Sequence, residues 1–180
     1  MRELSLFSGG GGGVLASRLL GHRIVGYVEW DTYCQEVLAQ RQRDGWIDTA
    51  PIFGDVREFL DSGAALLYRG VADIVSGGFP CQPFSVAGKR GACSDERNMW
   101  PETAEVLRVV RPRIFLGENV PGLLSATSPD GSRYFGTVLR DLAELGYVTR
   151  WGVLGADDAG APHRRKRLWI VGQLEHPDRR

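Results

Sequence analysis

Cys81 is the residue of this sequence whose setting most favours chemistry. It lies in the segment Gly-Gly-Phe-Pro-Cys-Gln-Pro-Phe-Ser, residues 77–85, directly after an apolar run at 71–75 that is typical of a short buried strand. Pro80 and Pro83 restrict the backbone on both sides of the cysteine. The thiol is therefore expected at the carboxyl end of a strand, which is where open α/β sheets bind ligands. For an isolated cysteine, the alternative is a small buried apolar residue in a turn.

Three carboxylates end predicted strands in the same way: Glu29 ends a strand at 23–29, Asp55 follows a strand at 51–53, and Glu118 ends a strand at 113–118. Glu29 lies 18 residues beyond Gly11, near the distance of about 20 residues at which an acidic residue accepts hydrogen bonds from a ribose. The alternative for an acid at this place is to cap the helix predicted at 32–42, a role that we assign to Asp31.

A run of glycines separates the first predicted strand, at 3–7, from a helix at 14–20. The run consists of Ser8 and residues 9–13, all five of which are glycine. A strand, a glycine loop and a helix form the arrangement that binds phosphates or nucleotides, because glycine permits close approach and the helix amino end attracts negative charge. A flexible linker is the alternative, and it is less economical between two apolar elements.

Composition limits the class of protein. The 180 residues predict one domain, and three cysteines without a CxxC pair predict a reduced, intracellular protein. No apolar run approaches the roughly 20 residues of a membrane helix, so no membrane partner is expected. With 22 basic and 22 acidic residues, binding to nucleic acid requires a local patch, for which residues 164–167, Arg-Arg-Lys-Arg, are the candidate. A solvated charged hairpin is the alternative for these four residues.

Alternation of strands and helices predicts the fold class: an α/β protein with a doubly wound, mostly parallel sheet and an antiparallel late strand. Further helices are expected at 57–67, from 98 or 101 to 110, and at 134–145, and the late strands at 147–154 and 168–173. The polar stretch 86–97 is interpreted as a mobile lid or an ordinary surface loop.

Four segments together resemble the cytosine-C5 DNA methyltransferases. Phe-Pro-Cys-Gln-Pro-Phe-Ser at 79–85 is similar to the nucleophile motif, Leu-Phe-Ser-Gly-Gly-Gly-Gly at 6–12 to the cofactor loop, Glu-Asn-Val at 118–120 to the motif of that name, and 160–167 to the Gln-x-Arg-x-Arg motif, with His163 in place of glutamine. Their order and spacing agree across nearly the whole chain.

The resemblance implies a methyl transfer from S-adenosylmethionine to cytosine C5 in double-stranded DNA. The catalytic residues would be Cys81, which adds to C6, Glu118, which contacts N3, and Arg165, which holds the flipped nucleotide. No metal is implied. The DNA-binding residues implied by the family are Gln82, Ser85, Lys89, Arg90, Arg97, Arg165 and Arg167.

The resemblance also implies a cofactor site. In it Glu29 would bind the ribose and Asp55 the adenine amine, with Trp30 and Val56 on the adenine faces. The full set of implied cofactor residues is Phe7, Ser8, Gly9, Gly11, Gly12, Glu29, Trp30, Asp55, Val56 and Pro80. Gly13 departs from the family, in which many members carry a large apolar residue against adenine.

The family pattern normally continues into a target-recognition region and closing motifs, whereas this sequence ends at Arg180. We therefore expect a catalytic domain at 1–180 without target recognition, from a bacterial or phage-type cytoplasmic protein. It would be a fragment, half of an enzyme completed by a second polypeptide, or a compact enzyme. Alternative functions are a non-catalytic half-enzyme module and an RNA cytosine-C5 methyltransferase. A nicotinamide-dependent dehydrogenase is the weakest alternative, because it gives Cys81 and Glu118 no joint role.

Overall fold

The computed structural model describes residues 1–80, 98–128 and 130–175. The predictions made for Cys81, Gln82, Ser85, Lys89, Arg90 and Arg97, and for the lid at 86–97, therefore lie outside the described residues. The strands are β1 Arg2–Leu6, β2 Arg23–Val28, β3 Ile52–Phe53, β4 Ile74–Gly77, β5 Ile114–Asn119, β6 Tyr147–Leu154 and β7 Arg167–Leu174. The helices are α1 Gly12–Leu19, α2 Thr32–Arg43, α3 Val56–Asp61, α4 Trp100–Val110 and α5 Tyr134–Glu144, with 3-10 turns η1 Ala64–Tyr68, η2 Pro121–Leu124 and η3 Asp157–Ala159.

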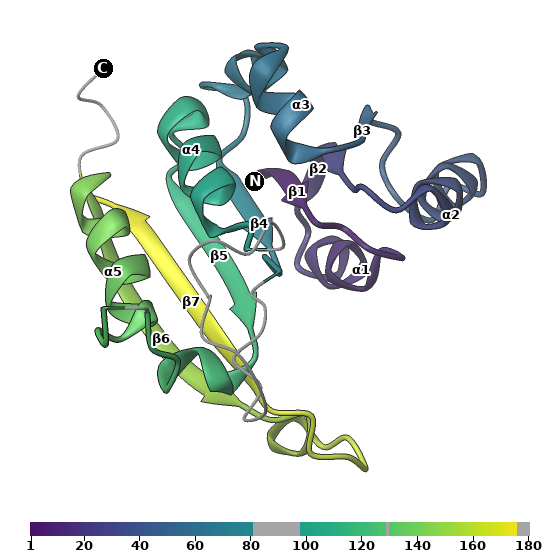
Figure 1. Cartoon of the computed structure of the whole chain (residues 1–180). Coiled ribbons are helices and arrows are strands. Elements are labelled where there is room, and N and C mark those ends of the chain that lie inside the picture. The colour runs from purple at the N-terminus through teal and green to yellow at the C-terminus, as the bar shows by residue number, and fades with distance from the viewer. Residues whose placement is uncertain (81–97, 129, 176–180) are drawn as a thin grey trace.

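The strands form one twisted sheet in the order β3-β2-β1-β4-β5-β7-β6, which can be followed from right to left in Figure 1. Neighbours from β3 to β5 are parallel, and β7 runs antiparallel to both β5 and β6. The predicted doubly wound sheet with an antiparallel late strand is confirmed. Because β1, β2, β3, β4 and β5 are parallel, their carboxyl ends lie along one edge.

Two apolar cores lie on the two faces of the sheet. The larger contains Leu4, Val75 and Phe115 from the strands and is covered by α3, α4 and α5. The smaller joins Ile24 and Tyr27 of β2 to buried residues of α1 and α2, including Val14 and Leu38. Helices on both faces therefore fix the sheet, and the edge formed by the carboxyl ends of the strands is left for loops.

Two predicted elements differ from the structure. The helix expected at 57–67 is divided into α3 and η1, because Gly63 adopts φ +76° and ends the α-helical turn. The strand expected to begin at residue 71 begins at Ile74. Val71 and Ala72 instead close the turn after η1, since both backbone N–H groups donate to the carbonyl of Tyr68.

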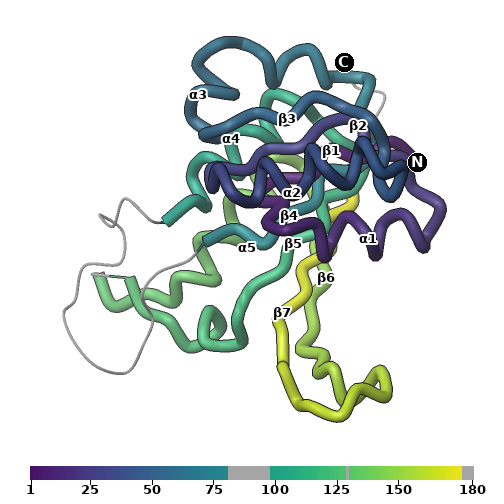
Figure 2. Tube along the Cα trace, turned by 90° about the vertical axis from the view of Figure 1, so that its right-hand side faces the viewer, coloured from purple at the N-terminus to yellow at the C-terminus, as the bar shows by residue number. Residues whose placement is uncertain are grey.

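The connection between β6 and β7 projects from the body of the molecule, as Figures 1 and 2 both show. It contains η3 and the exposed basic residues that follow it, and both strands continue from the sheet toward it. Within the described residues, no helix is long and apolar enough to cross a bilayer.

Candidate active site

The glycine loop after β1 adopts backbone torsion angles that are unfavourable for residues with a side chain. Gly9 and Gly11 adopt φ +53° and +92°, and Gly11 is the N-cap of α1. Phe7 also has a positive φ, +51°, which is uncommon for a residue with a Cβ and costs energy that the surroundings must supply. A hydrogen bond of Ser8 offsets part of this energy, because the Ser8 hydroxyl donates to the carbonyl of Ser5 at 3.0 Å. The loop is therefore held in one conformation at the carboxyl end of β1.

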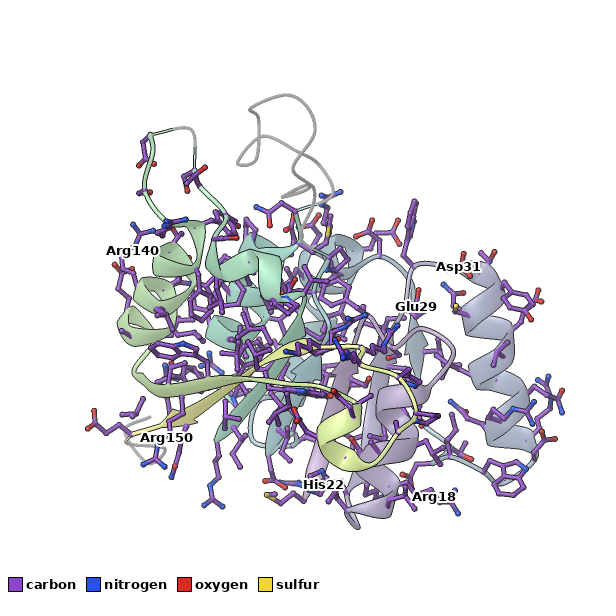
Figure 3. All side chains as sticks on the ribbon, turned by 90° about the horizontal axis from the view of Figure 1, so that it is seen from below. Arg18, His22, Glu29, Asp31, Arg140 and Arg150 are labelled. Carbon is purple, nitrogen blue, oxygen red and sulfur yellow. The ribbon has the colours of Figure 1, made fainter. Side chains whose placement is uncertain are left out.

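Glu29 holds this loop from the neighbouring strand. The residue is 9% exposed, and its Oε2 accepts a hydrogen bond from the backbone N–H of Gly9 at 2.6 Å. Oε1 accepts from the N–H of Asp31 at 2.9 Å, and Figure 3 shows both acids where β2 leads into α2. A carboxylate oxygen has more than one lone-pair direction, so Glu29 retains capacity to accept from a ligand hydroxyl.

Asp31 is the N-cap of α2, as predicted, because Oδ1 accepts the N–H of Cys34 at 2.8 Å. This hydrogen bond lowers the pKa of Asp31. Trp30, between the two acids, is 79% exposed and presents its ring to solvent. The two acids therefore have different roles, one at the loop and one at the helix, while the aromatic ring is free to stack on a planar group.

Asp55 lies at the end of the next strand. The Glu29 N–H donates to the carbonyl of Phe53 at 3.0 Å, so the ends of β2 and β3 are joined. Asp55 caps α3 by accepting the N–H of Arg57 at 2.7 Å. Val56 begins α3 and is 4% exposed, which places it in the core rather than on an open surface. The cofactor residues predicted in and after β1, β2 and β3 thus lie along one continuous edge of the sheet.

Glu118 lies on the other half of that edge, near the end of β5. Its Oε1 accepts from Nε of Arg167 at 2.6 Å, and both side chains are partly buried. The parallel register pairs Gly77 of β4 with Gly117 of β5. An ideal Cβ at residue 78 would lie 2.8 Å from Oε2 of Glu118, so glycine there allows the carboxylate to approach the backbone that leads to Cys81.

The four basic residues at 164–167 lie in two different environments. Arg164, Arg165 and Lys166 are exposed on the projecting connection, whereas Arg167 is half-buried against Glu118. The predicted DNA-binding role of both arginines stays a prediction, and the ion pair gives Arg167 a second task. Among the described residues, no group of histidine, cysteine or acidic side chains has the arrangement of a metal site.

Sequence reasoning did not identify the ion pair between Arg167 and Glu118. The two residues belong to different motifs, and only the antiparallel register of β5 and β7, with Glu118 opposite Trp169, brings them together. A signal was available in Arg167, which directly precedes the strand predicted at 168–173, but periodicity could not show which strand lies beside that one.

The fold is that of the Rossmann-like methyltransferases. The S. pombe Dnmt2 methyltransferase superposes with a TM-score of 0.71 at 23% sequence identity, over 97% of this chain and 51% of that one. The family model for C-5 cytosine-specific DNA methylases matches residues 1–179, and the chain belongs to this family.

Two similar curated proteins are both type II methyltransferases. The type II methyltransferase M.NgoBI of Neisseria gonorrhoeae is 37% identical over 172 residues, which is 95% of this chain and 50% of the relative. The type II methyltransferase M.HpaII of Haemophilus parainfluenzae is 36% identical over 172 residues, 94% of this chain and 45% of the relative. The chain therefore spans about half the length of these relatives.

Proposed function

We propose that this chain is the catalytic domain of a DNA (cytosine-5)-methyltransferase. The observation that carries the proposal is the place of Glu118: an acid at the end of β5, held by Arg167, beside the backbone that leads from β4 to Cys81. An acid at one strand end, beside the backbone that leads to a cysteine, suits a reaction that needs a nucleophile and a proton donor on one ring. Membership of the family supplies the substrate class.

The other half of the edge fits S-adenosylmethionine. Gly9 and Gly11 leave the loop without Cβ atoms, Glu29 and Asp55 provide carboxylates at neighbouring strand ends, and Trp30 offers an exposed ring. These are the groups that a methionine moiety, a ribose, an adenine amine and an adenine face require. When bound, the cofactor supplies an electrophilic methyl carbon attached to a positively charged sulfur.

The chain's own residues prepare the acceptor. The Cys81 thiolate adds to C6 of cytosine while Glu118, in its protonated form, donates its proton to N3, so that the electron pair of the C5–C6 double bond becomes available at C5. After C5 has taken the methyl group, a base removes the C5 proton, the pair re-forms the double bond, and Cys81 leaves as a thiolate. The proton at N3 returns to Glu118.

The target cytosine has to leave the duplex, because a thiol cannot reach C6 within the base stack, and flipping costs a few kcal/mol. Arg165, on the exposed connection before β7, would bind the phosphates of the flipped nucleotide. The proposed DNA-binding surface also includes five residues whose role is implied only by the family resemblance: Gln82, Ser85, Lys89, Arg90 and Arg97. The proposed setting is the cytoplasm of a bacterial or phage-infected cell.

The test is single-turnover transfer of labelled methyl from S-adenosylmethionine to unmethylated duplex DNA, with tRNA as a second acceptor. We expect transfer to DNA by the wild type and by Cys34→Ser, a matched change at a cysteine on α2, and loss of transfer in Cys81→Ser. Full activity of folded Cys81→Ser would contradict the mechanism. Transfer to tRNA and not to DNA would show that the substrate is RNA.

A second polypeptide that supplies target recognition is the finer part of the proposal. Its support is the half-length match to the curated relatives. If a folded wild-type chain binds S-adenosylmethionine and transfers no methyl group, we expect activity to appear when such a polypeptide is added. Sequence-specific transfer by the 180-residue chain on its own would contradict this part.

A further inference from the structure

We propose that Asn119 is a positioning residue for the nucleophile, acting through the backbone of Phe79, an inference that rests on the proposed function. Asn119 ends β5 directly after Glu118 and is 6% exposed. Its Nδ2 donates to the carbonyl of Phe79 at 3.0 Å, across 40 residues of chain. Phe79 precedes Cys81 by two residues. Cys81 lies outside the described residues, and the described backbone that leads to it ends at Pro80.

Both ends of the Asn119 amide are engaged. Oδ1 accepts the backbone N–H of Val120 at 2.8 Å, while Nδ2 donates to the Phe79 carbonyl. The contact with Val120 fixes the orientation of the side-chain amide. In that orientation Nδ2 points to the Phe79 carbonyl and donates to it. An amide is required here, because no other side chain of this size combines an acceptor with an N–H donor.

The segment after β4 has a second attachment. The carbonyl of Pro80 accepts the N–H of Met99 at 3.0 Å, and the ring of Phe79 lies 5.1 Å from that of Trp100 at the start of α4. Consecutive carbonyls, those of Phe79 and Pro80, are thus bound from β5 and from the start of α4. Two carbonyl contacts on adjacent peptides leave little freedom for the backbone that enters Cys81.

The contact with Asn119 relates the nucleophile to the acid. Glu118 and Asn119 are consecutive in β5, so the strand that carries the carboxylate also holds the peptide that leads to the thiol. Gly78 packs against that carboxylate on the same segment. Loss of the Asn119 donor would therefore alter the distance between Glu118 and Cys81 and leave the cofactor half unchanged, and a displacement of about 1 Å can lower a rate about 100-fold.

The experiment compares Asn119→Asp with Tyr147→Phe. The first variant keeps the acceptor for Val120 and replaces the donor by oxygen. The second removes a buried hydroxyl that donates to the Pro112 carbonyl at 2.8 Å, a bond of the same kind away from the site. Each leaves a buried carbonyl without its donor, so both are expected to lower the Tm. Asn119→Ala serves as a second variant without the introduced carboxylate.

Three measurements are made on each variant: single-turnover methyl transfer, the Kd for S-adenosylhomocysteine, and the rate at which iodoacetamide alkylates Cys81 in a Cys34→Ser, Cys93→Ser background. We expect transfer to fall about 100-fold in Asn119→Asp and by less than about threefold in Tyr147→Phe, with both Kd values unchanged. A fall in Asn119→Asp no larger than that in Tyr147→Phe would overturn the proposal.

Failure of the proposed function is separable from failure of this inference. If the wild type transfers no methyl group to any acceptor, the alkylation rate decides. A several-fold change in Cys81 alkylation in Asn119→Asp, with none in Tyr147→Phe, supports the positioning role. Equal alkylation rates in the wild type and both variants overturn it.

Discussion

The two halves of the strand-end edge are held together by different kinds of contact. In the cofactor half, Gly9 bonds to Glu29 over 20 residues, Cys34 to Asp31 over three, and Arg57 to Asp55 over two. In the reaction half, Asn119 reaches Phe79 over 40 residues, and Glu118 is held by Arg167 of another strand. Two of the three contacts in the first half are helix caps, and all three span 20 residues or fewer, whereas both contacts in the second half span 40 residues or more.

This difference implies that the two activities can be separated. Local caps and turns form with their own helices, so cofactor binding should survive changes that disturb the arrangement of β4, β5 and β7. Catalysis requires the long-range contacts to be correct at the same time. Substitutions in the two halves should therefore give opposite patterns of cofactor affinity and transfer rate.

The largest effect is expected for Glu118→Gln. Glutamine retains the shape of the side chain, but it cannot transfer a proton and it removes the carboxylate that pairs with Arg167. We expect single-turnover transfer to fall by about 10²–10⁴, the range found for a general acid or base, with cofactor affinity unchanged. Isothermal titration with S-adenosylhomocysteine and labelled methyl transfer measure the two quantities.

The matched change in the other half is Glu29→Gln. It removes the charge that accepts from Gly9 and Asp31, so cofactor affinity should fall about tenfold, which corresponds to about 1.4 kcal/mol. Transfer at saturating cofactor should change far less than in Glu118→Gln. Equal losses of affinity in the two variants would show that the halves are not separable.

An intermediate effect is expected for Gly78→Ala. The added methyl group would lie 2.8 Å from Oε2 of Glu118, closer than carbon and oxygen atoms pack, so the carboxylate has to move. We expect transfer to fall about 10- to 100-fold with cofactor affinity unchanged. Gly152→Ala on β6, where an added Cβ meets no described atom within 4 Å, is the control. Unchanged transfer in Gly78→Ala would show that Glu118 tolerates the displacement.

The local half of the site was the more predictable from sequence. The glycine run after a strand, Asp31 before a helix and Glu29 at a strand end each predict their role within about 20 residues. The structure confirms the cap at Asp31, and it adds that the Glu29 carboxylate holds the glycine loop. Helix and strand periodicity likewise gave the sheet class and most element boundaries.

The long-range half could be identified only in part. The motifs that contain Cys81, Glu118 and Arg167 predict which residues take part, but not which side chains meet. The pairing of Arg167 with Glu118 follows from β7 lying beside β5, and the contact of Asn119 with Phe79 follows from the parallel ends of β4 and β5. Periodicity contains no information about the neighbour of a strand, so such contacts require the assembled sheet.

The smallest effect is expected for Asp31→Ala, which removes the N-cap of α2 and leaves the N–H of Cys34 without its acceptor. The Tm should fall by a few degrees near neutral pH, and Asp31→Asn, which keeps an acceptor, should lose less. The hydrogen bond from Cys34 lowers the pKa of Asp31 in the folded state, so its stabilisation is present above the ordinary aspartate pKa of about 3.9.

As the pH falls below that value and through the lowered pKa, the folded carboxylate is protonated and the stabilisation is lost. The difference in Tm between wild type and Asp31→Ala should therefore be constant from about pH 5 to 8 and narrow below about pH 4. Thermal unfolding followed by circular dichroism measures it. If α2 is a local unit, transfer at saturating cofactor stays near the wild-type value. A large loss of transfer would instead extend the reaction half into α2 and remove the distinction between the halves.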